Sequence, residues 1–297
     1  MLSGEDISEY QVLCRAKGSE HSVVPDVHEE DFIFRFLLSN PCFKRKDEAV
    51  NYYFEDGARA ARKLKDLVET VCGIKPDQVE LLEFASGFGC VTRHLVKVFP
   101  RENITSCDIH EKAVDFCSGM FGVQTLLSRN RPEDLVIGRR FDVVFALSFF
   151  SHMPDLTWGR WLAVLLSAVK DGGYLIFTVH GAESIKFLNY PVVTDGYWFK
   201  AESEQKDLDA NQYGLTITTP EYVVKRLAGC QDAALDMYRK ADWWGHQDMY
   251  VVKRERNEFL RSSSLEGSQE GSRLAHDPRP RAAGLLKRAF SRERSRG

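Results

Sequence analysis

The sequence predicts an α/β fold of three layers, with helices on both faces of a mostly parallel sheet. Two observations carry this prediction. Short apolar runs of strand length alternate with stretches whose apolar residues recur at helical spacing. Near the end of the chain, two further apolar runs at 233–240 and 247–253 are joined by a short connection and predict an antiparallel hairpin.

The clearest strand–turn–helix–strand unit lies at residues 79–108. Its first apolar run carries Glu83 and leads into a turn of small residues, Pro100 ends the helix, and the second run ends at Asp108. A turn of small residues lets a ligand approach the backbone, and the N–H groups that open the next helix point toward it. Asp108 follows Gly87 by 21 positions, a spacing at which an acid can bind both ribose hydroxyls. This unit therefore predicts a site for a nucleoside-containing cofactor at the carboxyl edge of the sheet.

The details of the turn distinguish between two cofactor classes. In the dinucleotide pattern G-x-G-x-x-G, Thr92 stands where the last glycine is needed. The pattern E-x-A-x-G-x-G followed by an acid-tipped strand resembles instead the first motif of class I S-adenosylmethionine-dependent methyltransferases. Ala85 departs from that pattern, which usually has glycine there. The resemblance implies S-adenosylmethionine as cofactor and a Rossmann-like sandwich with a seven-stranded, mostly parallel sheet and a C-terminal antiparallel hairpin.

The resemblance also implies roles for individual residues. The first acid of the family motif lies near the methionine ammonium, the glycines leave room for the methionine and ribose portion, and the second acid holds the ribose. The cofactor-binding residues implied in this way are Glu83, Ala85, Gly87, Phe88, Gly89, Asp108, Ile109, Ser128, Leu147 and Ser148. Many family members hold the adenine amine with an acid after the third strand. This chain offers Ser128 or Asn130 there, so adenine recognition stays open.

Composition places the chain among ordinary globular proteins, with 43% apolar and 28% charged residues over 297 positions. A net charge of −3 gives no global sign of nucleic-acid binding. The seven cysteines form no C-x-x-C pair, which favours reduced thiols in a cytoplasmic protein over disulfides or a zinc site. The first residues lack the apolar core of a signal peptide, and no apolar run approaches the ~20 residues that span a bilayer.

The chain divides into three predicted parts. Residues 1–46 form an N-terminal lead-in, poorly ordered at first, with a short helix at 29–38. Residues 47–254 hold the methyltransferase-like domain. Residues 255–297 read as a disordered tail that is basic toward its end. The tail is either simply solvated or makes weak contact with an anionic surface such as the inner face of the membrane.

Two segments of the predicted domain have alternative interpretations. A long amphipathic helix is predicted at 47–72, and its Tyr52, Tyr53 and Phe54 either face the sulfonium of the cofactor or pack on the core. Residues 181–219 lose all periodicity after the fifth predicted strand. Long irregular loops in compact domains are usually functional, so we expect this lid insertion to cover the cleft. The alternative is a surface insertion with its own apolar cluster.

Three histidines follow predicted strands or the hairpin turn at the same edge of the sheet: His152, His180 and His246. Methyl transfer to a hydroxyl needs a positioned acceptor and a base, and a histidine pKa near ~6.5 suits proton removal at neutral pH. We therefore predict O-methylation of a small-molecule or glycan acceptor with His152 as the favoured base, and we expect Asp248 to orient or assist one of the three histidines. His180 and His246 are alternative catalytic or substrate-binding residues. No acid follows the fourth or fifth strand where metal-dependent relatives hold their ion, so no metal is predicted.

Three other functions were weighed against this one. A catalytically silent methyltransferase-like binding module is the main alternative, favoured by Ala85 and by the missing adenine acid. A nicotinamide oxidoreductase is disfavoured by Thr92 and by the hairpin. A nucleic-acid methyltransferase is disfavoured because basic residues cluster only in the tail and no N-P-P-Y-like motif follows the fourth strand. The predicted partner is thus a small acceptor and no nucleic acid, and the sequence makes no prediction of oligomeric state.

Overall fold

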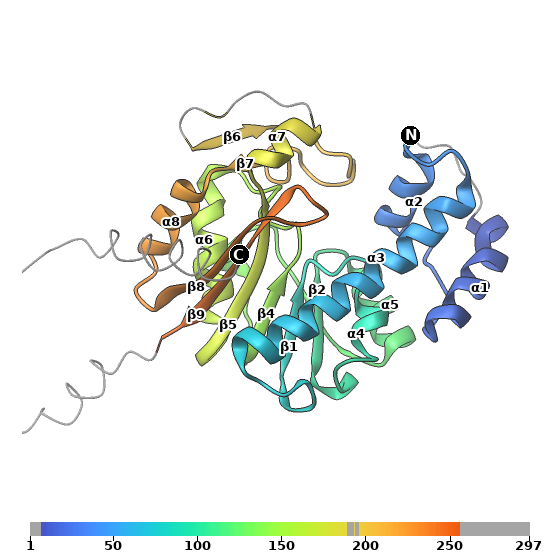
Figure 1. Ribbon diagram of the computed structural model, residues 1–297, viewed down its shortest axis with the longest axis horizontal. Helices are drawn as coiled ribbons and strands as arrows, with labels where there is room; N and C mark the ends of the chain where they lie inside the picture. Colours follow the sequence, from blue (N-terminus) through green and yellow to red (C-terminus); the bar gives the residue numbers. More distant parts are fainter. Residues whose placement is uncertain (1–6, 189–192, 194–195, 256–297) are drawn as a thin grey trace, which may run out of the picture.

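The computed structural model describes residues 7–188, 193 and 196–255. A seven-stranded sheet in the order β3-β2-β1-β4-β5-β9-β8 forms its centre (Figure 1). The parallel strands are β1 (Leu81–Phe84), β2 (Ile104–Asp108), β3 (Gln124–Leu127), β4 (Phe141–Ala146) and β5 (Val169–His180). The hairpin of β8 (Ala233–Trp243) and β9 (Gln247–Arg254) runs antiparallel to β5. The predicted fold class is confirmed.

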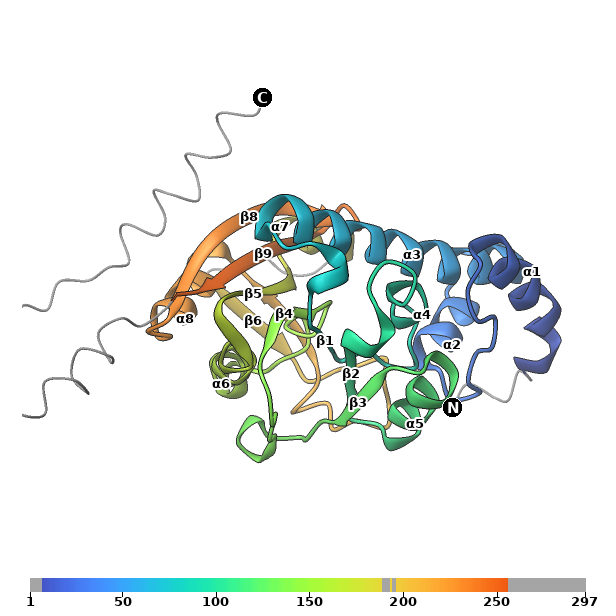
Figure 2. The ribbon, with the colours of Figure 1, turned by 90° about the horizontal axis from the view of Figure 1, so that it is seen from below.

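Helices cover both faces of this sheet, because successive strand residues point to opposite sides. Leu82 and Val144 belong to the core under α6 (Asp155–Ser167) and α8 (Pro220–Ala228). Leu81 and Val143 belong to the core on the other face, under α3 (Lys46–Leu67), α4 (Thr92–Leu95) and α5 (Glu111–Phe121). Figure 2 shows α3 along one side of the sheet and α6 on the other.

The N-terminal region is more regular than predicted. Residues expected to be poorly ordered contain the helix α1 (Gln11–His21), and α2 (Phe32–Ser39) follows it. Both helices pack against the first half of α3 around the buried residues Phe34 and Tyr53, in a third apolar cluster (Figure 1). This long-range packing orders a stretch whose own sequence is largely polar.

Several element boundaries differ from the predicted ones. The helix after the glycine turn, α4, has only four residues and stops before Pro100, where the sequence predicted its end. Helix α5 ends at Phe121 and is followed by Gly122, which adopts a left-handed conformation. The glycines Gly172 and Gly173 lie inside β5, because this strand already begins at Val169, which pairs with Phe141 of β4. The long helix α3 ends in one π-helical turn over Val68–Cys72.

The insertion after β5 is not irregular throughout. It contains α7 (Ala182–Leu188) and a two-stranded sheet of β6 (Tyr197–Lys200) and β7 (Leu215–Thr218). Residues 201–214, which join β6 to β7, are called the strap below. Within the described part of the chain, none of the helices has the length and apolarity to cross a bilayer. The predicted tail, apart from Glu255, lies outside the described residues, and the three-part division of the chain stays a prediction.

Candidate active site

A cavity of about 660 Å³ lies at the carboxyl edge of β1 and β2, a volume typical of small-molecule sites. Its floor consists of the residues that follow β1, β2 and β3. Its walls come from α2 and the preceding loop, from the strap, and from the loop after β4. The floor residues include Ala85, Ser86, Gly87, Phe88, Asp108, Ile109, His110, Ser128, Arg129 and Asn130. The wall residues include Glu30, Asp31, Arg35, Phe149, Met153, Gln205, Asp207, Asp209, Gln212 and Tyr213.

The two glycines of the turn after β1, Gly87 and Gly89, have different structural roles. Gly87 has φ +55°, and a Cβ placed on it would meet no atom within 4 Å, so it leaves the turn open toward the cavity. Gly89 has φ +78°, and its Cβ would lie 2.3 Å from the Phe121 ring, so this glycine lets the turn pack on α5. Ala85 adopts φ +59° at the position where the family pattern has glycine. A non-glycine residue in this conformation is strained, which is common at functional sites.

Asp108 closes the floor of the cavity. Its Oδ2 accepts a hydrogen bond from the Gly87 backbone N–H at 2.8 Å. Its Oδ1 accepts from the backbone N–H and the Nδ1 of His110, at 3.0 and 2.8 Å. The acid that the spacing singled out thus lies directly against the glycine turn. Six residues of the predicted cofactor set line the cavity: Ala85, Gly87, Phe88, Asp108, Ile109 and Ser128.

The other four predicted cofactor residues, among them Gly89, are not among those that line the cavity. Glu83 is buried behind the turn, where it accepts a hydrogen bond from the Thr92 hydroxyl at 2.6 Å, and burial raises the pKa of its carboxyl to about 8. Leu147 packs in the core on the α3 face. Ser148, with φ +58°, accepts a hydrogen bond from Gln247 Nε2 at 2.8 Å and lies 2.8 Å from the Ser151 hydroxyl. These contacts fix the start of the loop that carries His152.

The three predicted histidines are neighbours, and each contacts the insertion after β5, through Gly214, Thr216 and Ser184 respectively. The ring centroids of His152 and His180 lie 6.3 Å apart, and those of His180 and His246 lie 5.8 Å apart. None of the three is among the residues that line the cavity. His152 comes nearest, because its ring stacks at 4.4 Å on Tyr213, which forms part of the wall. Burial lowers the pKa of each histidine, that of His180 to about 3.

The orientation of His152 is fixed by the strap. Its Nδ1 lies 2.8 Å from the Gly214 carbonyl oxygen, so Nδ1 carries the proton and Nε2 keeps its lone pair. His246 instead places its Nδ1 3.1 Å from the Ser184 hydroxyl. Asp248 was predicted to help a histidine, but its carboxylate accepts hydrogen bonds from the Tyr238 hydroxyl at 3.0 Å and the Ala241 N–H at 2.8 Å. Among its described hydrogen bonds none involves a histidine, and it braces the bulged β8–β9 hairpin instead.

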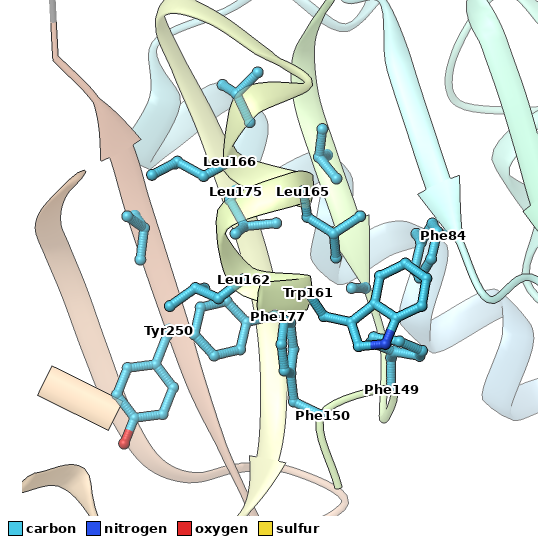
Figure 3. Packing of buried hydrophobic residues seen from close by; sticks show 14 of the residues in the cluster. Phe84, Phe149, Phe150, Trp161, Leu162, Leu165, Leu166, Leu175, Phe177 and Tyr250 are labelled. Carbon is cyan, nitrogen blue, oxygen red and sulfur yellow. The ribbon is translucent and has the colours of Figure 1, made fainter. Parts of the chain in front are cut away.

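Sequence reasoning missed two parts of the cavity wall, the segment 30–35 and an apolar end. The segment 30–35 lies some fifty positions before the glycine turn and carries no motif of its own. Phe84, Phe149 and Trp161 form an apolar end of the cavity, with ring centroids 4.9 to 5.5 Å apart (Figure 3). Phe84 and Trp161 lie in a strand and a helix whose apolar patterns gave no signal that these two residues face a cavity.

The aromatic residues of α3 pack on the core rather than face the cofactor. Tyr53 and Phe54 are fully buried, and Tyr52 is not among the cavity residues. The Tyr53 hydroxyl donates to Asp31 Oδ2 at 2.6 Å and accepts from Arg93 Nη2 at 3.0 Å. Through these bonds α3 supports the wall of the cavity at Asp31 without entering it.

Comparison with known families agrees with this geometry. Residues 82–175, which run from β1 into β5, match a family model described as a methyltransferase domain. Over these residues the chain is similar to methyltransferase domains. Its sheet order and its C-terminal hairpin have the arrangement expected from that resemblance.

Two curated relatives each match part of this chain. A malonyl-[acyl-carrier protein] O-methyltransferase of Calditerrivibrio nitroreducens is 27% identical over 43% of this chain and 48% of the relative. A release factor glutamine methyltransferase of Koribacter versatilis is 33% identical over 26% of this chain and 30% of the relative. The chain therefore spans about half or less of the length of these relatives.

Solved structures of methyltransferases are also similar to this one. An S-adenosylmethionine-dependent methyltransferase from Clostridium acetobutylicum aligns with a TM-score of 0.49 and 14% identity, over 68% of this chain and 92% of that one. A magnesium protoporphyrin IX methyltransferase from Synechocystis PCC 6803 aligns with a TM-score of 0.49 and 11% identity, over 84% of this chain and all of the other.

Proposed function

We propose that this methyltransferase uses S-adenosylmethionine and methylates a hydroxyl of a small-molecule or glycan acceptor. The observation that supports this most is the position of Asp108 on the cavity floor, against the open turn at Gly87. The residues present fit the cofactor. When the cofactor is bound, the Asp108 carboxylate would hold the ribose hydroxyls, the backbone around Gly87 would receive the methionine portion, and the apolar end at Phe149 and Trp161 would suit the flat adenine ring.

The bound cofactor supplies an electrophilic methyl group on a sulfonium that leaves readily. The protein then has to orient the acceptor, exclude water and remove one proton. His152 is the base in this proposal, because its Nδ1–H is held by Gly214 and its Nε2 lone pair can take the hydroxyl proton. Burial keeps the ring neutral at neutral pH, since it lowers the pKa. Tyr213 covers His152 on the cavity side, so a shift of Tyr213 must admit the acceptor.

His180 and His246 are proposed to shape the acceptor side rather than to act as bases. The lowered pKa of His180, to about 3, makes it a neutral side chain at every physiological pH. One matched relative carries the name of an O-methyltransferase, which supports oxygen as the acceptor atom. A cytoplasmic location and the anionic-surface contact of the tail stay predictions.

Calorimetric titration with S-adenosylmethionine, S-adenosylhomocysteine and NAD(H) tests the cofactor. We expect micromolar binding of the first two and none of the third. Incubation with radiolabelled S-adenosylmethionine and a panel of hydroxylated small molecules and glycans then tests transfer. Binding of NAD(H) alone would overturn the cofactor assignment, and cofactor binding without transfer to any acceptor would favour the silent binding module.

A further inference from the structure

His110 lies between two carboxylates that belong to different parts of the chain. It follows the tip of β2, and its Nδ1 is 2.8 Å from Asp108 Oδ1. Its Nε2 is 2.8 Å from Oδ2 of Asp207, which belongs to the strap. The Gln205 side-chain nitrogen lies 3.3 Å from the same Nε2. His110 therefore connects the floor of the cavity to the strap. The strap and the segment 30–35 are together called the roof below.

The strap is fixed at its other end to the loop after β4. The Gly214 N–H donates to the His152 carbonyl at 2.9 Å, and the Thr216 N–H donates to the Ser151 carbonyl at 2.7 Å. Between this anchor and His110, six strap residues line the cavity: Gln205, Asp207, Leu208, Asp209, Gln212 and Tyr213. The strap thus crosses the cavity from the β4 side to the β2 side. On the β2 side it is held by the contact between Asp207 and His110, which is called the latch below.

The chemistry of this latch depends on the proton count of His110. A neutral imidazole has one N–H, whereas an imidazolium has two, and an ionised carboxylate only accepts. Both short contacts are therefore hydrogen bonds only when His110 is protonated. The hydrogen bond and charge of Asp108, together with Asp207, raise the pKa of His110. In the neutral form, Nδ1–H stays on Asp108, Nε2 accepts from Gln205, and the contact with Asp207 is lost.

One ion pair of other residues lies near the latch. Lys112, two positions further along α5, forms an ion pair with Glu30 of the opposite wall. Asp108 and Asp207 are the charged groups that act on the His110 ring. The side chain of Asp207 remains 58% exposed, so its bond to His110 has the modest strength of a surface pair.

We propose that His110 is a positioning residue that couples cofactor binding to closure of the strap. The proposal rests on the proposed function, because it requires the cofactor ribose on Asp108. A carboxylate fixed by the ribose holds His110 in place, and His110 then holds Asp207 and the strap over the bound cofactor. The strap in turn carries Tyr213 and the Gly214 carbonyl, which set the acceptor wall and the orientation of His152. Floor and roof therefore act as one unit.

Hydrogen–deuterium exchange of the strap tests this coupling, with exchange corrected for intrinsic rates. In the wild type we expect S-adenosylhomocysteine to slow exchange at 205–213. Asp207→Asn, which keeps the shape of the side chain, should reduce that protection about 2- to 5-fold. The matched control is Glu202→Gln, because Glu202 is also an acid of the strap but pairs with Lys200 outside the cavity. It should keep the wild-type protection.

The pH dependence of this protection is a second measurement. A purely structural role of His110 would not make the protection depend on pH. The pKa of His110 is raised, so protection should be strongest below it and fall as the pH rises through it. In Asp207→Asn this pH dependence should largely disappear. Failure of S-adenosylhomocysteine to bind the wild type would overturn the proposed function and the coupling with it. Binding without slower exchange at 205–213, or equal protection and pH dependence in Asp207→Asn, would overturn the coupling alone.

Discussion

The floor and the roof of the cavity are built in different ways. The floor takes its central residues from the unit at 79–110, and it is formed mainly by backbone. Gly87 is left-handed and its N–H donates to Asp108, and α5 starts at the end of this unit. The roof takes its residues from segments far apart in the chain, namely 30–35 and the strap at 201–214. These segments meet the floor through side-chain contacts such as His110 with Asp207.

This difference separates two parts of the function. A floor made of turn backbone and one carboxylate can bind a fixed chemical group, here the ribose and methionine portion in our proposal. A roof made of loops can change its side chains without disturbing the sheet, so acceptor choice is expected to depend on it. Substitutions in the two regions should therefore change different measured quantities.

The largest expected effect is on turnover, from the roof side. His152→Ala should lower kcat about 100- to 10,000-fold if it is the base, with little change in the dissociation constant of S-adenosylmethionine. In the wild type, the lowered pKa of His152 should keep the base active at mildly acid pH, and kcat should fall only as the pH drops through that pKa. His180→Ala is the matched control. It should keep this fall of kcat at low pH, which is called the acid limb of the profile. Retained turnover in His152→Ala would place the base elsewhere.

The next largest effect is on stability and concerns the floor. Gly89→Ala would put a side chain on a left-handed residue, and its Cβ would lie 2.3 Å from the Phe121 ring. We expect it to lower the free energy of unfolding by about 2–4 kcal/mol, measured by denaturant titration. Gly87→Ala has the same kind of strain but open space, so it should cost only about 1–2 kcal/mol. Equal losses in the two variants would show that the packing of the turn on α5 is not what Gly89 provides.

A third effect is on cofactor affinity. Asp108→Ala removes a charged acceptor from the floor and should weaken S-adenosylmethionine binding about 10- to 100-fold in calorimetry. Asp115→Ala, an exposed acid on the neighbouring α5, controls for the loss of one negative charge. Unchanged affinity in Asp108→Ala would remove this residue from the cofactor site.

The same contrast explains what the sequence could and could not predict. The acid at 108 and the glycine at 87 were singled out by local spacing, and both lie on the cavity floor in the structure. Their ligand roles stay predictions. Glu83 and Gly89 were given ligand roles, but their burial behind the turn depends on Thr92 and Phe121, which the local pattern does not reveal. Asp248 lies two positions after His246 in sequence, yet its carboxylate accepts a hydrogen bond from the Tyr238 hydroxyl of β8, a contact that local spacing does not reveal.

The walls were beyond local reasoning for a related reason. Residues 30–35 reach the cavity only because α2 packs on α3, and the latch at His110 requires Asp207 from nearly a hundred positions away. Residues 181–219 were expected to cover the cleft. Part of this prediction, the strap, does line the cavity, although β6, β7 and α7 give the segment more regular structure than its pattern indicated.

The smallest expected effect belongs to the hydroxyl of Tyr213. Its ring stacks on His152 at 4.4 Å, and no described residue hydrogen-bonds its hydroxyl, so Tyr213→Phe should change kcat by less than about 2-fold. Tyr213→Ala is the informative partner, because it removes the ring that buries His152. Exposure should raise the pKa of His152 toward the ordinary ~6.5, so the acid limb of the kcat profile should move to higher pH. An unmoved acid limb in Tyr213→Ala would mean that the titrating base is not the histidine behind this ring.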